Sequence, residues 1–160
     1  MDEEPRFGWY AHPPPGRKPW RDPGPPPRRS VEQARRDPYP VRMFTETCCA
    51  FALWGPLSER PPTGPDVEEG LLESQLPISA GLRERILAWA RDYERYDSGD
   101  RSIPMDDFDK RGFDLSRELQ RQLGELYTVQ FHFTFAGDRS DLRKVAEDDV
   151  VPGWRVSRWD

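Results

Sequence analysis

Hydrophobic and polar positions are patterned most clearly between residues 106 and 135. From residue 108 to residue 123, apolar residues recur every three or four positions, and charged or polar residues fill most positions between them. That spacing predicts an amphipathic helix over about 107–123, with Asp106 as its N-cap. We expect Gly124 to end this helix, because glycine enters the left-handed conformation without steric cost. From Tyr127 to Phe135 the period becomes two, which predicts a β-strand with one buried face.

A second amphipathic helix is predicted over about 80–96, where Ser79 supplies the N-cap. Residues 96–105 form a short connection to the helix at 107–123, so we expect the two helices to pack as an antiparallel pair. Gly112 lies on the apolar stripe of the later helix, although glycine in a helix interior costs about 1 kcal/mol relative to alanine. We therefore expect Gly112 to allow the two helices to approach closely.

The remaining strands are predicted upstream of the helices. The stretch VRMFTET at 41–47 alternates two sets of side chains, which indicates a strand. The apolar stretch that follows predicts a second short strand or a buried loop near 50–54, with Trp54 as a core anchor. Residues 58–76 are rich in proline and glycine and are predicted to form a long loop, a kind of segment that is often functional or mobile. The predicted fold is α+β, with a small sheet packed against the helix pair.

Proline separates an arm from the globular part of the chain. Of the 18 prolines, 11 lie within residues 1–40. Because proline lacks an N–H and restricts its neighbour, these residues are predicted to be an extended or disordered arm, with one or two helical turns at 30–36. Residues 41–135 are predicted to be the globular domain and residues 136–160 a C-terminal tail. The tail tryptophans, Trp154 and Trp159, either fold back on the domain or anchor a partner.

Charge follows the same division. Residues 1–40 carry eight basic and six acidic side chains, a net charge of +2, whereas residues 41–160 carry 16 basic and 23 acidic side chains, a net charge of −7. A domain with this charge is a poor general binder of nucleic acid, because phosphate contacts need a positive surface. The acidic domain instead suits a basic protein partner.

Catalytic and metal-binding patterns are sparse. Cys48 or Cys49 at the end of the first strand could meet His132 on the last strand as a thiol–imidazole pair, but both cysteines lie in an apolar run and more simply fill space. The two cysteines and two histidines lack the spacing of a zinc site, and the aspartates at 97–109 match no calcium loop. No phosphate-binding or dinucleotide-binding glycine motif is present. The sequence predicts neither an enzyme nor a cofactor.

The sequence therefore favours a non-enzymatic module that binds another protein, as an inhibitor of the immunity type or as an assembly factor. Aromatic and arginine side chains in the arm and tail are typical of segments that dock on a partner. The alternative is association with nucleic acid through the basic aromatic arm. With no apolar leader at the N-terminus and no run long enough to span a bilayer, we expect a cytoplasmic protein without a membrane partner. The predicted partner-binding residues are Trp9, Tyr10, Trp20, Arg21, Arg28, Arg29, Trp154 and Trp159.

Overall fold

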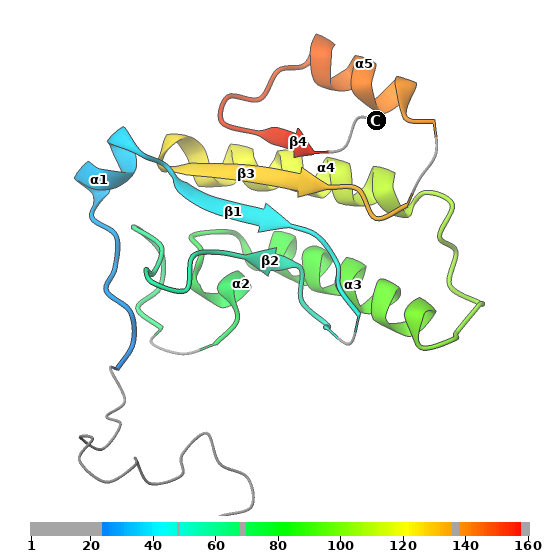
Figure 1. The fold of residues 1–160 in the computed structure, drawn as a ribbon, viewed down its shortest axis with the longest axis horizontal. Helices are drawn as coiled ribbons and strands as arrows, with labels where there is room; N and C mark the ends of the chain where they lie inside the picture. The colour runs from blue at the N-terminus through cyan, green and yellow to red at the C-terminus, as the bar shows by residue number, and fades with distance from the viewer. Residues whose placement is uncertain (1–23, 48, 68–69, 136–137, 158–160) are drawn as a thin grey trace, which may run out of the picture.

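A four-stranded mixed sheet lies at the centre of the protein (Figure 1). The computed structural model describes residues 24–47, 49–67, 70–135 and 138–157. Within them the strand order is β2 (Leu53–Trp54), β1 (Tyr39–Met43), β3 (Tyr127–His132) and β4 (Arg155–Ser157). β1, β3 and β4 run parallel, and β2 pairs with β1 in the antiparallel direction. Two strands far apart in sequence, β1 and β3, thus form the middle of the sheet.

Two long helices cover one face of this sheet, behind it in Figure 1. They are α3 (Ala80–Asp97) and α4 (Phe108–Leu123), and they run antiparallel. Arg85 near the start of α3 pairs with Glu118 near the end of α4. Asp92 near the end of α3 pairs with Arg111 near the start of α4. Shorter elements complete the described chain: α1 (Val31–Arg36), α2 (Leu72–Gln75), the 3-10 turn η1 (Gly124–Leu126) and α5 (Ser140–Asp148). The predicted α+β fold is confirmed.

Several element boundaries differ from those predicted. The first strand begins at Tyr39 rather than 41 and ends at Met43, because its pairing with β3 covers Tyr39 to Met43. The N-cap position of α4 is Asp107, one residue after the expected Asp106, and its side chain makes no capping hydrogen bond. β3 ends at His132 instead of continuing to 135. After it, the N–H groups of Thr134 and Phe135 donate to the side chain of Asp109, at 2.8 and 2.9 Å, in place of a neighbouring strand.

Residues beyond 137 add a helix and a strand to the same structure. β4 pairs with β3, and Trp154 beside it is only 8% exposed. Its ring packs edge-on against Phe113 of α4 at 5.0 Å, and its Nε1 donates to Ser116 Oγ at 3.0 Å. The buried side chain of Arg117 pairs with Asp149, which follows α5. Of the two alternatives for the tail tryptophans, folding back on the domain is the one that the structure shows for Trp154.

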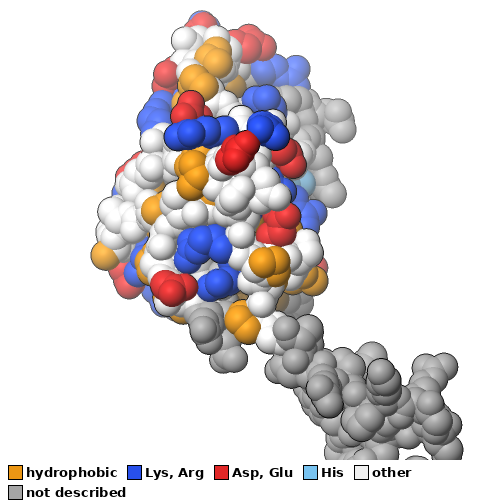
Figure 2. Space-filling model, turned by 90° about the vertical axis from the view of Figure 1, so that its left-hand side faces the viewer, with side chains coloured by type: hydrophobic (Ala, Val, Ile, Leu, Met, Phe, Trp, Pro, Cys, Tyr) orange, Lys and Arg blue, Asp and Glu red, His pale blue; other side chains and the backbone are white. Residues whose placement is uncertain are grey.

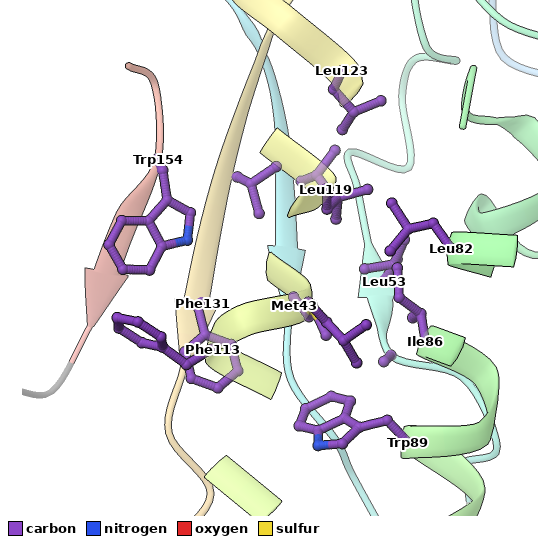
Figure 3. Close-up of a cluster of buried hydrophobic side chains, with 14 of the residues drawn as sticks. Met43, Leu53, Leu82, Ile86, Trp89, Phe113, Leu119, Leu123, Phe131 and Trp154 are labelled. Carbon is purple, nitrogen blue, oxygen red and sulfur yellow. The ribbon is translucent and has the colours of Figure 1, made fainter. Parts of the chain in front are cut away.

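The core lies between the helix pair and the sheet. β3 alternates as its sequence pattern predicts, with Tyr127, Val129 and Phe131 buried and the residues between them partly exposed. Figure 3 shows side chains of α3, α4, β1 and β3 pointing toward one another in this layer. Its labelled members are Met43, Leu53, Leu82, Ile86, Trp89, Phe113, Leu119, Leu123, Phe131 and Trp154.

Two buried polar side chains form hydrogen bonds with backbone groups of the sheet that have no partner on a neighbouring strand. Gln120 of α4 accepts from the N–H of Val129 at 2.7 Å and donates to the carbonyl of Tyr127 at 3.0 Å. Glu73 of α2 is fully buried, and its Oε1 accepts from the N–H groups of Ala52 and Leu53 at 2.9 and 3.0 Å. Because β2 is an edge strand, this carboxylate occupies backbone donors that would otherwise invite another strand. Both contacts tie a helix to the sheet.

Gly112 marks the closest packing between the helices and the sheet. A Cβ atom at this position would lie 2.4 Å from Trp89 Cζ2 of α3 and 2.8 Å from Phe131 Cε2 of β3. Both rings are buried, so they have little room to move aside. Trp89 is also held in place, because it stacks on Phe108 and its Nε1 donates to the carbonyl of Phe108 at 2.9 Å. The expected close approach is confirmed, and it involves β3 as well as α3.

The substitution Gly112→Ala is expected to lower the free energy of unfolding by about 1–3 kcal/mol, because the added methyl group overpacks a rigid site. Chemical denaturation of the purified chain measures the difference. Gly81→Ala is the matched control, since a Cβ there meets nothing within 4 Å in the first turn of α3. Equal stability of the Gly112→Ala variant and the wild-type protein would contradict this account of the packing.

Candidate protein-binding surfaces

The face of the sheet opposite α3 and α4 carries no helix of the described chain (Figure 1). Strand register places Trp54, Arg42, Gln130 and Arg155 in one row across all four strands of this face. Arg42 and Arg155 are exposed, and Trp54 and Gln130 are partly exposed. We call this surface, with Phe44 and His132 of the adjacent row, the open sheet face. Backbone pairing between the strands holds these side chains in place.

Aromatic side chains gather at the β2 end of the open sheet face. Phe44 stacks on Trp54 with ring centroids 5.0 Å apart and planes 9° from parallel, and Phe51 contacts the same indole at 4.7 Å. The guanidinium of Arg42 lies 5.9 Å from the centre of the Phe44 ring. On the other side of Phe44, the imidazole of His132 packs at 5.5 Å and its Nδ1 lies 2.8 Å from Ser157 Oγ.

The charge on the open sheet face is positive. Among the described residues, neither Arg42 nor Arg155 forms an ion pair with a carboxylate, although ion pairs hold many other arginines of the chain. A hollow of about 310 Å³ opens beside Arg42 where β1 and β3 end. Tyr93 of α3 lines it. Burial is the main cause that raises the pKa of this phenol, and the nearby Asp97 carboxylate raises it further. The hollow is lined by Arg42, Phe44, Thr45, Tyr93, His132, Phe133 and Thr134.

An oppositely charged groove of about 340 Å³ lies where α4 and α5 begin. Its apolar lining comes from Met105, Phe135 and Leu142, and five aspartates surround them against one lysine and one arginine. Asp109 is engaged within the fold, since it accepts from strand backbone and pairs with Arg139. The acid-lined groove, as we name it, therefore presents chiefly the exposed carboxylates. These are Asp106, Asp107, Asp138 and Asp141.

The two described arginines among the predicted partner-binding residues serve contacts within the chain. Arg29 is 12% exposed at its side chain, and its Nε pairs with Glu59 Oε2 at 2.6 Å. Arg28 donates to the carbonyl of Pro61 at 3.0 Å, and it bridges through its backbone to Arg60. Figure 2, which views the side on which α1 lies, shows basic, acidic and apolar side chains intermixed. On that side the arginines stabilise the start of the described chain.

Five other predicted partner-binding residues, Trp9, Tyr10, Trp20, Arg21 and Trp159, lie outside the described residues, and Trp154 lies in the core. Sequence reasoning missed the open sheet face as a site. Its signal was present in part, because alternation along the first strand already sets Arg42 and Phe44 opposite Val41 and Met43. What was absent was the strand order that brings Arg155 to the same row.

The residues considered for thiol and metal chemistry are only partly described. Cys49 is a half-buried free thiol, and Cys48 lies outside the described residues. Within the described ranges, no three His, Cys, Asp or Glu side chains gather as they would around a metal ion. None of the described helices combines the length and apolar character needed to cross a bilayer.

Comparison with known proteins identifies the family. The family model described as Serratia CdiI immunity protein-like matches residues 40–134. The chain belongs to this family. The matched region runs from β1 to the end of β3 and includes the helix pair, so it covers most of the open sheet face but not α5 or β4. A search of curated proteins finds no match. Membership supports an inhibitor of the immunity type that works by binding protein.

Replacing Arg29 with alanine is expected to lower the free energy of unfolding by about 1–3 kcal/mol, because Glu59 loses a charged hydrogen-bond donor. Thermal or urea unfolding measures the change. Arg35→Ala in the exposed face of α1 is the control, with an expected effect of less than about 0.5 kcal/mol. If Arg29→Ala folds with wild-type stability, the contact with Glu59 is not structural.

Proposed function

We propose that this protein is an immunity protein that binds a protein toxin and blocks its activity without catalysis. Family membership over residues 40–134 carries this proposal, since the match spans the sheet centre and both long helices. The proposed site of action is the cytoplasm, where the chain would meet a toxin before damage is done. Binding alone suffices for such a role, because a bound protein can occlude an active site.

The surfaces of the described chain support a protein partner. The open sheet face is an exposed platform of aromatic and arginine side chains, residue types enriched in protein interfaces. Residues 41–160 carry 16 basic and 23 acidic side chains, a net charge of −7, and we propose that this charge draws a basic toxin. Long-range attraction of this kind raises the rate of association more than it raises affinity.

The arm and the last residues are proposed to add contacts to the same partner. Trp9, Tyr10, Trp20 and Trp159 are of the residue types that most often dominate the binding energy of protein interfaces. The alternative, nucleic-acid binding through the arm, loses support because Arg28 and Arg29 already make contacts within the chain.

Neutralisation of a toxin is the direct test. Each reading frame that flanks the gene is expressed from an inducible promoter, with and without this chain. We expect one product to arrest growth, co-expression of this chain to restore growth, and the two purified proteins to elute as one complex. The toxin in the complex is expected to keep its intact mass.

Two results would contradict the proposal. Arrest that persists beside abundant soluble chain would remove the immunity role. Rescue accompanied by a covalent change in the toxin, without a stable complex, would show an enzyme rather than a binding inhibitor.

Charge in the acid-lined groove is expected to affect association with the toxin. The double variant Asp106→Asn/Asp141→Asn is expected to slow association about threefold or more at low salt, with a smaller effect at high salt, because screening already weakens the attraction there. Stopped-flow mixing with the toxin measures the rate. Glu84→Gln/Asp148→Asn removes two exposed carboxylates elsewhere and is the control for net charge. Equal slowing by both variants would show that the groove has no special part.

A further inference from the structure

We propose that the open sheet face binds an extended acidic segment of the toxin. Arg42 and Arg155 would pair with its carboxylates, and the stacked rings of Phe44 and Trp54 would take a neighbouring apolar side chain. This inference rests on the proposed immunity function and names the part of the partner that this face recognises.

Strand register sets the spacing of the two arginines. Arg42 aligns with Gln130, and Gln130 aligns with Arg155, so the arginines lie on alternate strands of one row. Strands in a sheet are about 4.8 Å apart, which places the two Cα atoms about 10 Å from each other. Long arginine side chains on such a base can reach two carboxylates that project from the same side of an extended segment. Gln130 between them offers an amide to the backbone of that segment.

The state of the two guanidinium groups favours an anionic ligand. Arg85 forms two short hydrogen bonds with Glu118, and Arg111 pairs with Asp92, so these charges are already compensated within the fold. Among the described residues no carboxylate plays that part for Arg42 or Arg155, and both side chains are exposed. A partner carboxylate therefore gains a charge-assisted, bidentate contact without displacing an existing ion pair.

The aromatic end of the face adds apolar contact area. Phe44 and Trp54 lie nearly parallel and are each partly exposed, while Trp54 Nε1 donates to the carbonyl of Phe44 at 3.4 Å. These contacts fix the rings before binding, so little side-chain entropy is lost when they are covered. An apolar residue beside the acidic ones in the partner would pack against them.

Single-stranded RNA also binds sheet faces through aromatic and arginine side chains. The charge of the chain argues against it here. Residues 41–160 hold 16 basic and 23 acidic side chains, and a polyphosphate would be repelled by this net charge of −7. A short acidic peptide segment brings few charges and can place each one beside an arginine.

The hollow beside Arg42 and the acid-lined groove share the segment that follows β3. Thr134 lines the hollow beside Arg42, and the next residue, Phe135, lines the groove. One toxin can therefore contact a positive surface and a negative surface at once. Opposite charges side by side exclude the reversed orientation, in which like charges would meet.

The test compares two double charge reversals against the toxin that the chain neutralises. Arg42→Glu/Arg155→Glu is expected to weaken binding at least about tenfold by calorimetry, because repulsion replaces two ion pairs. Arg91→Glu/Lys144→Glu changes the net charge equally at exposed positions on α3 and α5, and it is expected to stay within about twofold of wild type. Circular dichroism and thermal unfolding confirm that both variants fold. Arg42→Lys/Arg155→Lys keeps the charge but loses the bidentate contact, so its affinity is expected to lie between those of the charge reversal and the wild-type chain.

Charge reversal in the toxin then locates the acidic segment. Each exposed Asp or Glu of the toxin is changed to Arg, and the expected result is one or two substitutions that restore binding to Arg42→Glu/Arg155→Glu while weakening binding to the wild-type chain. Restoration by such a pair supports direct contact, because a general effect of net charge would be shared by every position.

Three other results would overturn the acidic-segment site, and they differ in what they say about the immunity role. Wild-type affinity of Arg42→Glu/Arg155→Glu for the toxin would overturn the acidic-segment site and leave the immunity role standing. Absence of any neutralised toxin would overturn both. Binding of fluorescein-labelled oligouridine that depends on Arg42 and Arg155 would overturn it in favour of RNA.

Discussion

The packing around Gly112 sets the distance between the helix pair and the sheet. Trp89 of α3 and Phe131 of β3 both occupy the space that a side chain at this position would need. α3, α4 and β3 therefore meet at one point, and the layers cannot shift apart without opening a cavity or together without a clash. Both long helices are held on the same face of the sheet, which leaves the opposite face without a helix of the described chain.

Polar side chains form hydrogen bonds with backbone groups at the ends and the edge of that sheet. Gln120 satisfies the start of β3, Asp109 satisfies the backbone beyond its end, and Glu73 occupies donors of the edge strand β2. Each is a helix residue whose side chain replaces a missing strand partner, so each joins the two layers by a directional contact. Apolar packing fixes the spacing of the layers, and these hydrogen bonds fix their register.

The sequence predicted the elements better than their arrangement. Period was enough for both long helices and for the buried face of β3, and Ser79 and Gly124 marked the start of α3 and the end of α4, because these features depend on neighbours within a few residues. The pairing of β1 with β3 depends on contacts between distant segments, and β4 is short and carries only one partly buried apolar residue, Val156. The open sheet face also depends on contacts between distant segments, so the predicted site residues did not include it. Arginine is a common residue in protein interfaces, but Arg29 pairs with Glu59 within the chain. Glu59 lies in a loop whose path cannot be predicted from the hydrophobic pattern of the sequence.

An uncovered sheet face in a small domain usually needs polar side chains, and a run of mixed charges would have met that need. The open sheet face instead has Phe44 stacked on Trp54 and arginines without a carboxylate beside them in the described chain. Neither feature is required to build the core, which lies on the other side of the same strands. Nor does the domain lack acids to compensate the arginines, since residues 41–160 hold 23. Solubility and folding thus leave these features unexplained, whereas the proposed binding of an acidic, partly apolar segment accounts for both.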